Sequence, residues 1–184
     1  MSEKEKMLAE ELYDANYDKE LIKDRYEAKD ICFEYNNLKS SDFDGKDRII
    51  KKLFAKTGKQ IIVEQNFWCD YGYNIFVGEN FYMNHNCTIL DGAKVEFGDN
   101  VFVAPNCGFY TAGHPLDYET RNKGLEYAKP IKIGNNVWIG GNVIVLPGVN
   151  IGDNVVIGAG SVVNKDIPSN SMAVGIPCKV IKKI

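Results

Sequence analysis

The side chain in this sequence best suited to acid–base chemistry is His114, within the segment Thr111-Ala-Gly-His-Pro115. An imidazole gains and loses a proton near neutral pH, so it can serve as a general base. Glu126 lies further along the same stretch and could orient the imidazole through a hydrogen bond. The plainer alternatives are an exposed loop histidine and a carboxylate solvated at the surface, and the sequence leaves both open.

Two further candidates are Asn84 and Trp138, which stand out in the six-residue register described below. Asn84 and Tyr82 flank Met83, whose side chain is expected to point inward, so the amide and the phenol share an outer face. Asn84 is also simply a good corner residue. Trp138 points outward by the same count, and an exposed tryptophan on such a face is typical of an interface anchor. Asp70, pointing outward, and Asp91, at a corner, are weaker candidates.

A six-residue repeat must position these residues. Residues 133–162 read IGNNVW, IGGNVI, VLPGVN, IGDNVV and IGAGSV, with Ile or Val first and Val or Ser fifth. A period of six fits neither a helix nor a flat strand, and it predicts short strands and corners wound into a parallel β-helix. The first and fifth positions should point inward. Glycine at the second position, and Asn, Asp or Gly at the third and fourth, fit corners that use positive φ.

The same six-residue repeat begins near residue 65 and is interrupted over residues 110–130, the stretch that contains His114. A long irregular insertion in a compact domain is usually functional or disordered, so this loop is the first place to look for function. We expect a mainly β protein, with a β-helix over residues 59–168, the loop at 110–130 inserted between coils, and an extended tail over 169–184.

Residues 1–58 differ in composition from the rest of the chain, because they are rich in Lys, Glu, Asp and Leu. A capping box at Ser2-Glu-Lys-Glu5 predicts a helix to about Tyr13, and further helices are expected over residues 19–38 and from about 42 to 58. A helical cap would cover the open end of a β-helix, where strand edges are otherwise unpaired. The functional alternative is that the cap also walls part of a binding site.

Composition and motifs exclude several classes of function. A net charge of −3 gives no electrostatic reason to expect nucleic acid or an anionic membrane as a partner. No apolar run reaches the length of about 18 residues that a membrane span needs. The polar start, Met-Ser-Glu-Lys-Glu-Lys, is unlike a signal peptide, and we expect a cytoplasmic protein. Five scattered cysteines without a CxxC pair are expected to be small core residues.

Metal and nucleotide chemistry also lack their usual residues. Zinc hydratases with six-residue repeats need three histidine ligands, whereas this chain has only His85 and His114. There is no P-loop, no GxSxG and no GxGxxG placed between a strand and a helix. We therefore expect no metal site, and any group donor must be recognised by the surface of the β-helix itself.

Beside the hexads and the T-x-G-H-P loop, the chain contains Ile133-Gly-Asn-Asn-Val-Trp-Ile-Gly140, Gly175-Ile-Pro-Cys178, Glu11-Leu-Tyr13, Arg25 and Cys69-Asp-Tyr-Gly-Tyr-Asn74. Taken together, these motifs resemble the hexapeptide-repeat acetyltransferases, and specifically their maltose/galactoside O-acetyltransferase group. This resemblance covers essentially the whole chain. It implies a left-handed β-helix, a homotrimer with active sites between subunits, and acetyl-CoA as co-substrate. The repeat alone leaves handedness open, and the usual rule for β crossovers favours the right hand.

The resemblance also assigns roles to individual residues. It makes His114 the base that takes the proton of a sugar hydroxyl, and Asn84 the group that stabilises the transition state. An acidic acceptor position near the N-terminus maps to Asp14 or Asn16, and Gly92 stands where some relatives have Asp. With the candidates above, the residues expected to bind the acetyl acceptor are Asn16, Asp70, Tyr82 and Asp91. The residues expected to bind the acetyl donor, acetyl-CoA, are Asn84, Trp138, Gly141, Ala159, Asn164, Lys165, Lys179 and Lys182.

Three functions follow as hypotheses. The leading one is an acetyl-CoA-dependent O-acetyltransferase acting on a sugar such as maltose, glucose or a galactoside. The second is an acetyltransferase for a non-sugar acceptor such as an antibiotic. The third is a non-catalytic β-helix scaffold, which would predict regular outward threonine or charge ladders that the sequence lacks.

Overall fold

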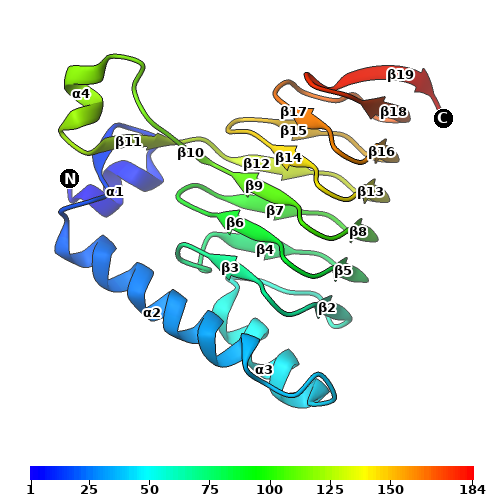
Figure 1. Ribbon diagram of the computed structural model, residues 1–184, viewed down its shortest axis with the longest axis horizontal. Helices are drawn as coiled ribbons and strands as arrows, with labels where there is room; N and C mark the ends of the chain where they lie inside the picture. Colours follow the sequence, from blue (N-terminus) through cyan, green and yellow to red (C-terminus); the bar gives the residue numbers. More distant parts are fainter.

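The computed structural model describes residues 1–184, and most of the chain winds into a parallel β-solenoid with three faces (Figure 1). Helices close one end of the solenoid, and an insertion projects from between its coils. The second face has six parallel strands, so the solenoid has about six coils. None of the helices combines the length and apolar composition that a membrane span requires. The predicted β-solenoid with a helical cap is confirmed, while its left-handed winding stays a prediction of the resemblance.

The elements have the following bounds. The helices are α1 (Glu3–Leu8), α2 (Lys19–Asn36), α3 (Phe43–Leu53) and α4 (Tyr118–Asn122). The first face consists of β4 (Ile75–Val77), β7 (Val95–Phe97), β12 (Ile131–Ile133) and β15 (Asn150–Ile151). The second face consists of β2 (Ile61–Val63), β5 (Phe81–Met83), β8 (Val101–Val103), β13 (Val137–Ile139), β16 (Val155–Ile157) and β18 (Ser171–Val174), with β19 (Lys179–Lys183) antiparallel at its edge. The third face consists of β3 (Trp68–Cys69), β6 (Thr88–Leu90), β9 (Gly108–Tyr110), β14 (Ile144–Val145) and β17 (Val162–Val163). A separate antiparallel sheet has the order β1 (Tyr13–Asp14), β11 (Leu125–Ala128), β10 (Ala112–Gly113).

The interior of the solenoid is built from the first and fifth positions of the hexads, as predicted. Ile133 and Val137, the first and fifth residues of one hexad, are both buried, and the same holds along the repeat. Larger side chains pack against one another inside the solenoid: the rings of Phe81 and Phe97 are tilted, with centroids 5.1 Å apart, and those of Phe97 and Phe109 meet edge to face, with centroids 5.0 Å apart. Alternation along each short strand therefore fixes which residues form the core.

The corners follow the prediction at the fourth position but not at the second. Asn100 and Asn136, both fourth residues, have φ of 57° and 56°, and the Asn100 amide donates to the Asn136 amide oxygen at 3.1 Å. At the second position, the glycines other than Gly72 have no positive φ. A Cβ on Gly134 would come within 2.4 Å of the Asp153 carboxylate and 2.8 Å of the Gly152 carbonyl carbon. Close approach of the next coil, not backbone conformation, therefore requires glycine there.

The N-terminal helices begin where predicted and end earlier. The capping box is present, with Glu5 N donating to the Ser2 hydroxyl at 3.1 Å and Ser2 N to the Glu5 carboxylate at 2.7 Å. Helix α1 ends at Leu8, because the chain must extend into β1. Helix α3 ends at Leu53, because from Ala55 onward the backbone pairs with the first coil, with Ala55 N donating to the Ile75 carbonyl at 3.0 Å.

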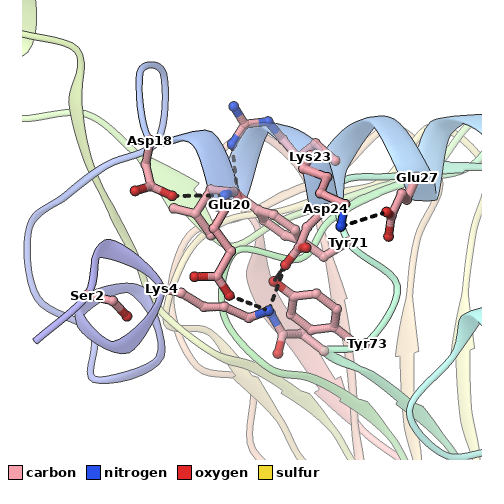
Figure 2. Close-up of polar contacts among 12 residues, drawn as sticks. Ser2, Lys4, Asp18, Glu20, Lys23, Asp24, Glu27, Tyr71 and Tyr73 are labelled. Atoms are coloured by element: carbon pink, nitrogen blue, oxygen red, sulfur yellow. Dashed lines mark hydrogen bonds and ion pairs between the residues drawn. The ribbon is translucent and has the colours of Figure 1, made fainter.

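The cap seals the solenoid, as expected. Buried residues of α2 and α3, among them Ala28, Cys32 and Ile50, belong to the same apolar core as the first coils. Figure 2 shows the polar contacts that tie α1 to α2: the Lys4 ammonium lies 2.7 Å from Asp24 and 3.3 Å from Glu20. The Tyr73 hydroxyl, from a corner of the solenoid, donates to the same Asp24 carboxylate at 3.1 Å.

The C-terminal segment is more ordered than the predicted extended tail. Strand β18 continues the second face in parallel register on β16, and β19 folds back antiparallel on β18. Residues beyond 168 thus complete the solenoid and cover its second open edge. The two prolines made an unpaired tail the natural prediction, but both lie outside the strands. Pro168 precedes β18, and Pro177 lies between β18 and β19.

Candidate active site

The insertion that holds His114 is closed at its base. Lys129 N donates to the Thr111 carbonyl at 2.8 Å. The buried Thr111 hydroxyl donates to the Leu90 carbonyl at 2.6 Å and accepts from Ala93 N at 2.9 Å, which anchors the insertion to the coil below. Between these ends the chain forms β10, the short helix α4 and β11, where the sequence had suggested an irregular loop. The base of the insertion is therefore rigidly joined to the solenoid.

His114 follows β10 and is exposed to solvent. Its Nδ1 lies 3.1 Å from the main-chain carbonyl oxygen of Leu125. A carbonyl can only accept a hydrogen bond, so Nδ1 carries a proton, and in the neutral imidazole Nε2 then keeps its lone pair. This tautomer is the one a general base needs, with the basic nitrogen facing outward.

The orienting contact of His114 differs from the expected one. The partner of Nδ1 is the carbonyl of Leu125, not the carboxylate of Glu126. Glu126 instead accepts a hydrogen bond from the hydroxyl of Tyr13, which is fully buried. Burial and the neighbouring carboxylate raise the pKa of Tyr13 well above its usual value, so it stays a donor. A main-chain carbonyl leaves no side-chain signal in a sequence, which is why this contact could not be foreseen.

The two aspartates of the acceptor side have different environments. Asp91 is fully buried, and its carboxylate accepts from the main-chain N–H groups of Asp70 at 3.0 Å, Tyr71 at 2.8 Å and Asn74 at 3.3 Å. Asp91 therefore fixes a corner and cannot face an acceptor, which corrects its expected role. The Asp70 carboxylate is partly buried and accepts no hydrogen bond within the chain. Burial and the charge of Glu126 raise its pKa to about 6.

Asn84 lies at a corner between the second and third faces. Its side-chain oxygen accepts from His85 N at 2.7 Å, so the amide nitrogen is left as a donor. Tyr82 precedes it on β5, in register with Ile62 and Phe102 on the outer surface of the second face. The insertion leaves the solenoid at a different corner, between the third and first faces (Figure 1). One chain thus holds Asn84 and His114 at separate corners.

The corner that holds Asn84 continues down the solenoid as a column of small residues. Successive coils are joined there by hydrogen bonds from Asn84 N to Val103 O at 2.9 Å and from Gly140 N to Ile157 O at 2.8 Å. Gly141 and Ala159 lie at this corner in the later coils. Trp138 flanks the column on the second face and is 58% exposed. Gly141, Ala159 and Trp138 are thus all accessible to solvent along this edge of the solenoid.

Comparison with known proteins places the chain in a family. Residues 6–58 match the family described as the maltose acetyltransferase hexapeptide capping motif, and residues 130–165 match the bacterial transferase hexapeptide repeats. A putative acetyltransferase of Saccharomyces cerevisiae is 58% identical over 98% of this chain and 92% of its own length. One from Staphylococcus aureus is 56% identical over 100% of this chain and 92% of its own length.

Solved structures agree with the sequence matches. The crystal structure of a maltose O-acetyltransferase from Clostridium difficile is 58% identical, with a TM-score of 0.98 over 100% of this chain and 98% of that one. A galactoside acetyltransferase in complex with coenzyme A is 44% identical, with a TM-score of 0.96 over 100% of this chain and 92% of that one. This chain belongs to the maltose/galactoside O-acetyltransferase group of the hexapeptide-repeat acetyltransferases. The resemblance seen in the sequence is confirmed, and the scaffold hypothesis is wrong because the family is enzymatic.

In this acetyltransferase the last four residues predicted to contact the donor lie at the end of the solenoid far from the cap. Asn164 and Lys165 follow β17, and Lys179 and Lys182 lie on β19; all four are exposed. None of the three lysines forms an ion pair within the chain, whereas Lys4 and Lys46 do. Their charges are therefore available to an external anion.

Asn16 contacts the insertion. Its side-chain amide donates to the carbonyl oxygen of Gly124, in the insertion, at 2.8 Å. The alternative position, Asp14, accepts from the main-chain N–H groups of Asn16 at 3.1 Å and Tyr17 at 2.9 Å. The Asn16 side chain of this acetyltransferase thus joins the cap to the insertion through its amide nitrogen, and its role toward an acceptor stays a prediction.

Proposed function

We propose that this acetyltransferase moves the acetyl group of acetyl-CoA to a hydroxyl of a sugar such as maltose, glucose or a galactoside, with His114 as the general base. The observation that carries the proposal is the hydrogen bond from His114 Nδ1 to the Leu125 carbonyl, which leaves Nε2 free to take a proton. The names of the maltose and galactoside enzymes support a sugar acceptor. The complexes of relatives with coenzyme A and acetyl-CoA support the donor.

The chemistry follows from these groups. Nε2 of His114 accepts the proton of the acceptor hydroxyl while that oxygen attacks the thioester carbonyl carbon. Negative charge develops on the carbonyl oxygen, and the side-chain N–H of Asn84 donates a hydrogen bond to it. The carbon–sulfur bond then breaks, and the thiolate of CoA takes the proton from the imidazolium. A thioester is already activated, so alignment, a base and an oxyanion donor suffice without a covalent nucleophile.

The corner column suits the pantetheine arm of the donor. From Asn84 to Ala159 it crosses three coil steps, which at about 4.8 Å per step is roughly 14 Å. Gly141 and Ala159 have no bulky side chain to obstruct an extended chain, and Trp138 offers an apolar wall. Beyond the column, Asn164, Lys165, Lys179 and Lys182 supply a polar group and three unpaired cations for the phosphates of CoA.

Asp70 and Tyr82 are the residues we propose for the acceptor. The Asp70 carboxylate has open acceptor sites, since no group of the chain donates to it. Tyr82 presents a phenol on the outer surface of the second face. A carboxylate and a phenol suit a ligand with several hydroxyl groups, because each hydroxyl both donates and accepts a hydrogen bond.

A homotrimer with active sites between subunits is the assembly we propose. Ile62, Phe102 and Trp138 form an apolar line on the outer surface of the second face, and they are 53%, 43% and 58% exposed. Large exposed apolar residues gathered on one face are typical of an interface. Rotational symmetry would also bring the Asn84 corner of one chain to the insertion of the next, which a single chain does not do.

The test is the variant His114→Ala, assayed by release of the free CoA thiol with maltose, glucose and a galactoside. Loss of a general base should lower kcat by about 10²–10⁴-fold. Acetyl-CoA binding by calorimetry and the oligomeric mass should stay as in the wild type. An unimpaired variant would show that His114 is not the base. Turnover of an antibiotic acceptor with none of the sugars would favour the non-sugar hypothesis instead.

A further inference from the structure

Three successive residues of the insertion are each held by the N-terminal cap. The side-chain amide of Asn16 donates to the Gly124 carbonyl at 2.8 Å. Asp14 lies opposite Leu125 in the antiparallel register of β1 and β11. The Tyr13 hydroxyl donates to the Glu126 carboxylate. We call these contacts of Tyr13, Asp14 and Asn16 with residues 124–126 the cap clamp.

The clamp rests on a well-packed support. Tyr13 is fully buried, and a Cβ on Gly92 would come within 2.9 Å of its hydroxyl oxygen, so the phenol fills the space above that glycine. The Asp14 carboxylate holds the turn that follows β1 by accepting two main-chain N–H groups, which fixes Asn16 in turn. Tyr13 also anchors a small apolar core apart from that of the solenoid, with Met7, Ala15, Leu21, Tyr71, Ala93 and Ala128.

The middle residue of the clamped segment is Leu125, whose carbonyl sets the tautomer and the direction of His114. We propose that the cap clamp positions His114 for proton transfer, and that Tyr13 and Asn16 are positioning residues for the acetyl transfer. The helical cap then has a second function besides sealing the solenoid: it fixes the loop that carries the base. The kinetic part of this inference rests on the proposed function, whereas the tautomer part does not.

The experiment uses the full-length protein labelled with ¹⁵N-histidine, in which only His85 and His114 contribute signals. The variants are Tyr13→Phe, which deletes one hydroxyl from a buried ring, and Asn16→Ala, which changes an exposed residue. In each, the ¹⁵N shifts should show His114 moving away from the pure Nδ1–H tautomer, with His85 as internal reference. Because small misplacements of a catalytic group are costly, kcat should fall about 10–100-fold with little change in KM for acetyl-CoA.

A matched control is Tyr73→Phe. Tyr73 also donates a hydrogen bond to the cap, to Asp24 at 3.1 Å, but it does not contact the insertion (Figure 2). This variant should keep the wild-type tautomer and kcat. If it lowers kcat as much as Tyr13→Phe does, general loosening of the cap explains the effect and the clamp is refuted.

The remaining outcomes are distinct. Wild-type tautomer and kcat in both Tyr13→Phe and Asn16→Ala would overturn the inference. A shifted tautomer with unchanged kcat would support positioning by the clamp while showing that His114 is not the base, so the proposed function would fail by itself.

Discussion

Two aspartates show that environment decides which polar residues of this chain are free for chemistry. Asp91 and Asp70 carry the same side chain, and the sequence offered both for the acceptor. Three main-chain N–H groups occupy the carboxylate of Asp91, whereas none donates to that of Asp70. Burial and the nearby charge of Glu126 make the ionised form of Asp70 costly, and Arg25 and Lys29 offset only part of that cost, so its pKa rises to about 6.

The raised pKa of Asp70 predicts how stability depends on pH. The folded protein holds this proton more tightly than the unfolded chain, so the favourable contribution is complete below about pH 4 and is lost as pH rises through about 6. The variant Asp70→Asn cannot ionise. It should raise the free energy of unfolding at about pH 8 by at most 2–3 kcal/mol, and by much less at about pH 4. Urea denaturation at the two pH values is the measurement.

The same variant separates stability from function. If Asp70 binds the acceptor, Asp70→Asn should raise KM for the sugar while making the fold more stable at neutral pH, a common compromise at binding sites. Equal gains in stability at both pH values would contradict the pKa argument. An unchanged KM would remove Asp70 from the acceptor site.

At the scale of elements, the corners of the solenoid carry specific conformational demands. Asparagine at the fourth position adopts a left-handed backbone and links its amide to the next coil, as Asn100 does with Asn80 at 2.9 Å and Asn136 at 3.1 Å. Asn at this position therefore contributes in two ways. It adopts a positive φ at low cost, and its side-chain amide joins a ladder of hydrogen bonds that runs from coil to coil.

Two substitutions at Asn100 separate these contributions. Asn100→Gly keeps the positive φ and loses only the exposed side-chain hydrogen bonds to Asn80 and Asn136. This loss should lower the free energy of unfolding by about 0.5–1.5 kcal/mol. Asn100→Ala adds the steric cost of a left-handed conformation, about 1–2 kcal/mol. Alanine should therefore be the less stable of the two in urea denaturation, and alanine equal to or better than glycine would refute the conformational argument.

At the scale of the whole molecule, the separation of His114 and Asn84 onto different corners makes an assembly prediction. In a trimer with shared sites, a complete site can form between a His114→Ala chain and an Asn84→Ala chain, each supplying what the other lacks. Unfolding an equal mixture of the two inactive variants and refolding it together should restore activity to about a quarter of wild type, because random mixing pairs them in that share of sites.

The control for this experiment is each variant refolded alone, which should stay inactive. Light scattering should give the mass of three chains for all samples. Inactive mixtures of trimeric protein would mean that both groups serve a site within one chain, and the proposal of sites between subunits would be wrong.

The sequence by itself determined the solenoid, its inward positions and the place of the insertion. It could do so because a six-residue period is a local property: each hexad encodes its own strand and corner, and side chains alternate along every strand. Its departures from that period singled out Asn84, Trp138 and His114, and the resemblance carried by those motifs identified the family.

Only the tertiary structure decided which groups hold the candidate base. The carbonyl of Leu125, the hydroxyl of Tyr13 and the amide of Asn16 come together from the insertion and from the cap, more than a hundred residues apart in the chain. No pattern in sequence records a main-chain acceptor or a pairing between distant strands such as β1 and β11. The same reason explains Asp91, whose carboxylate is taken up by contacts that exist only once the chain has folded.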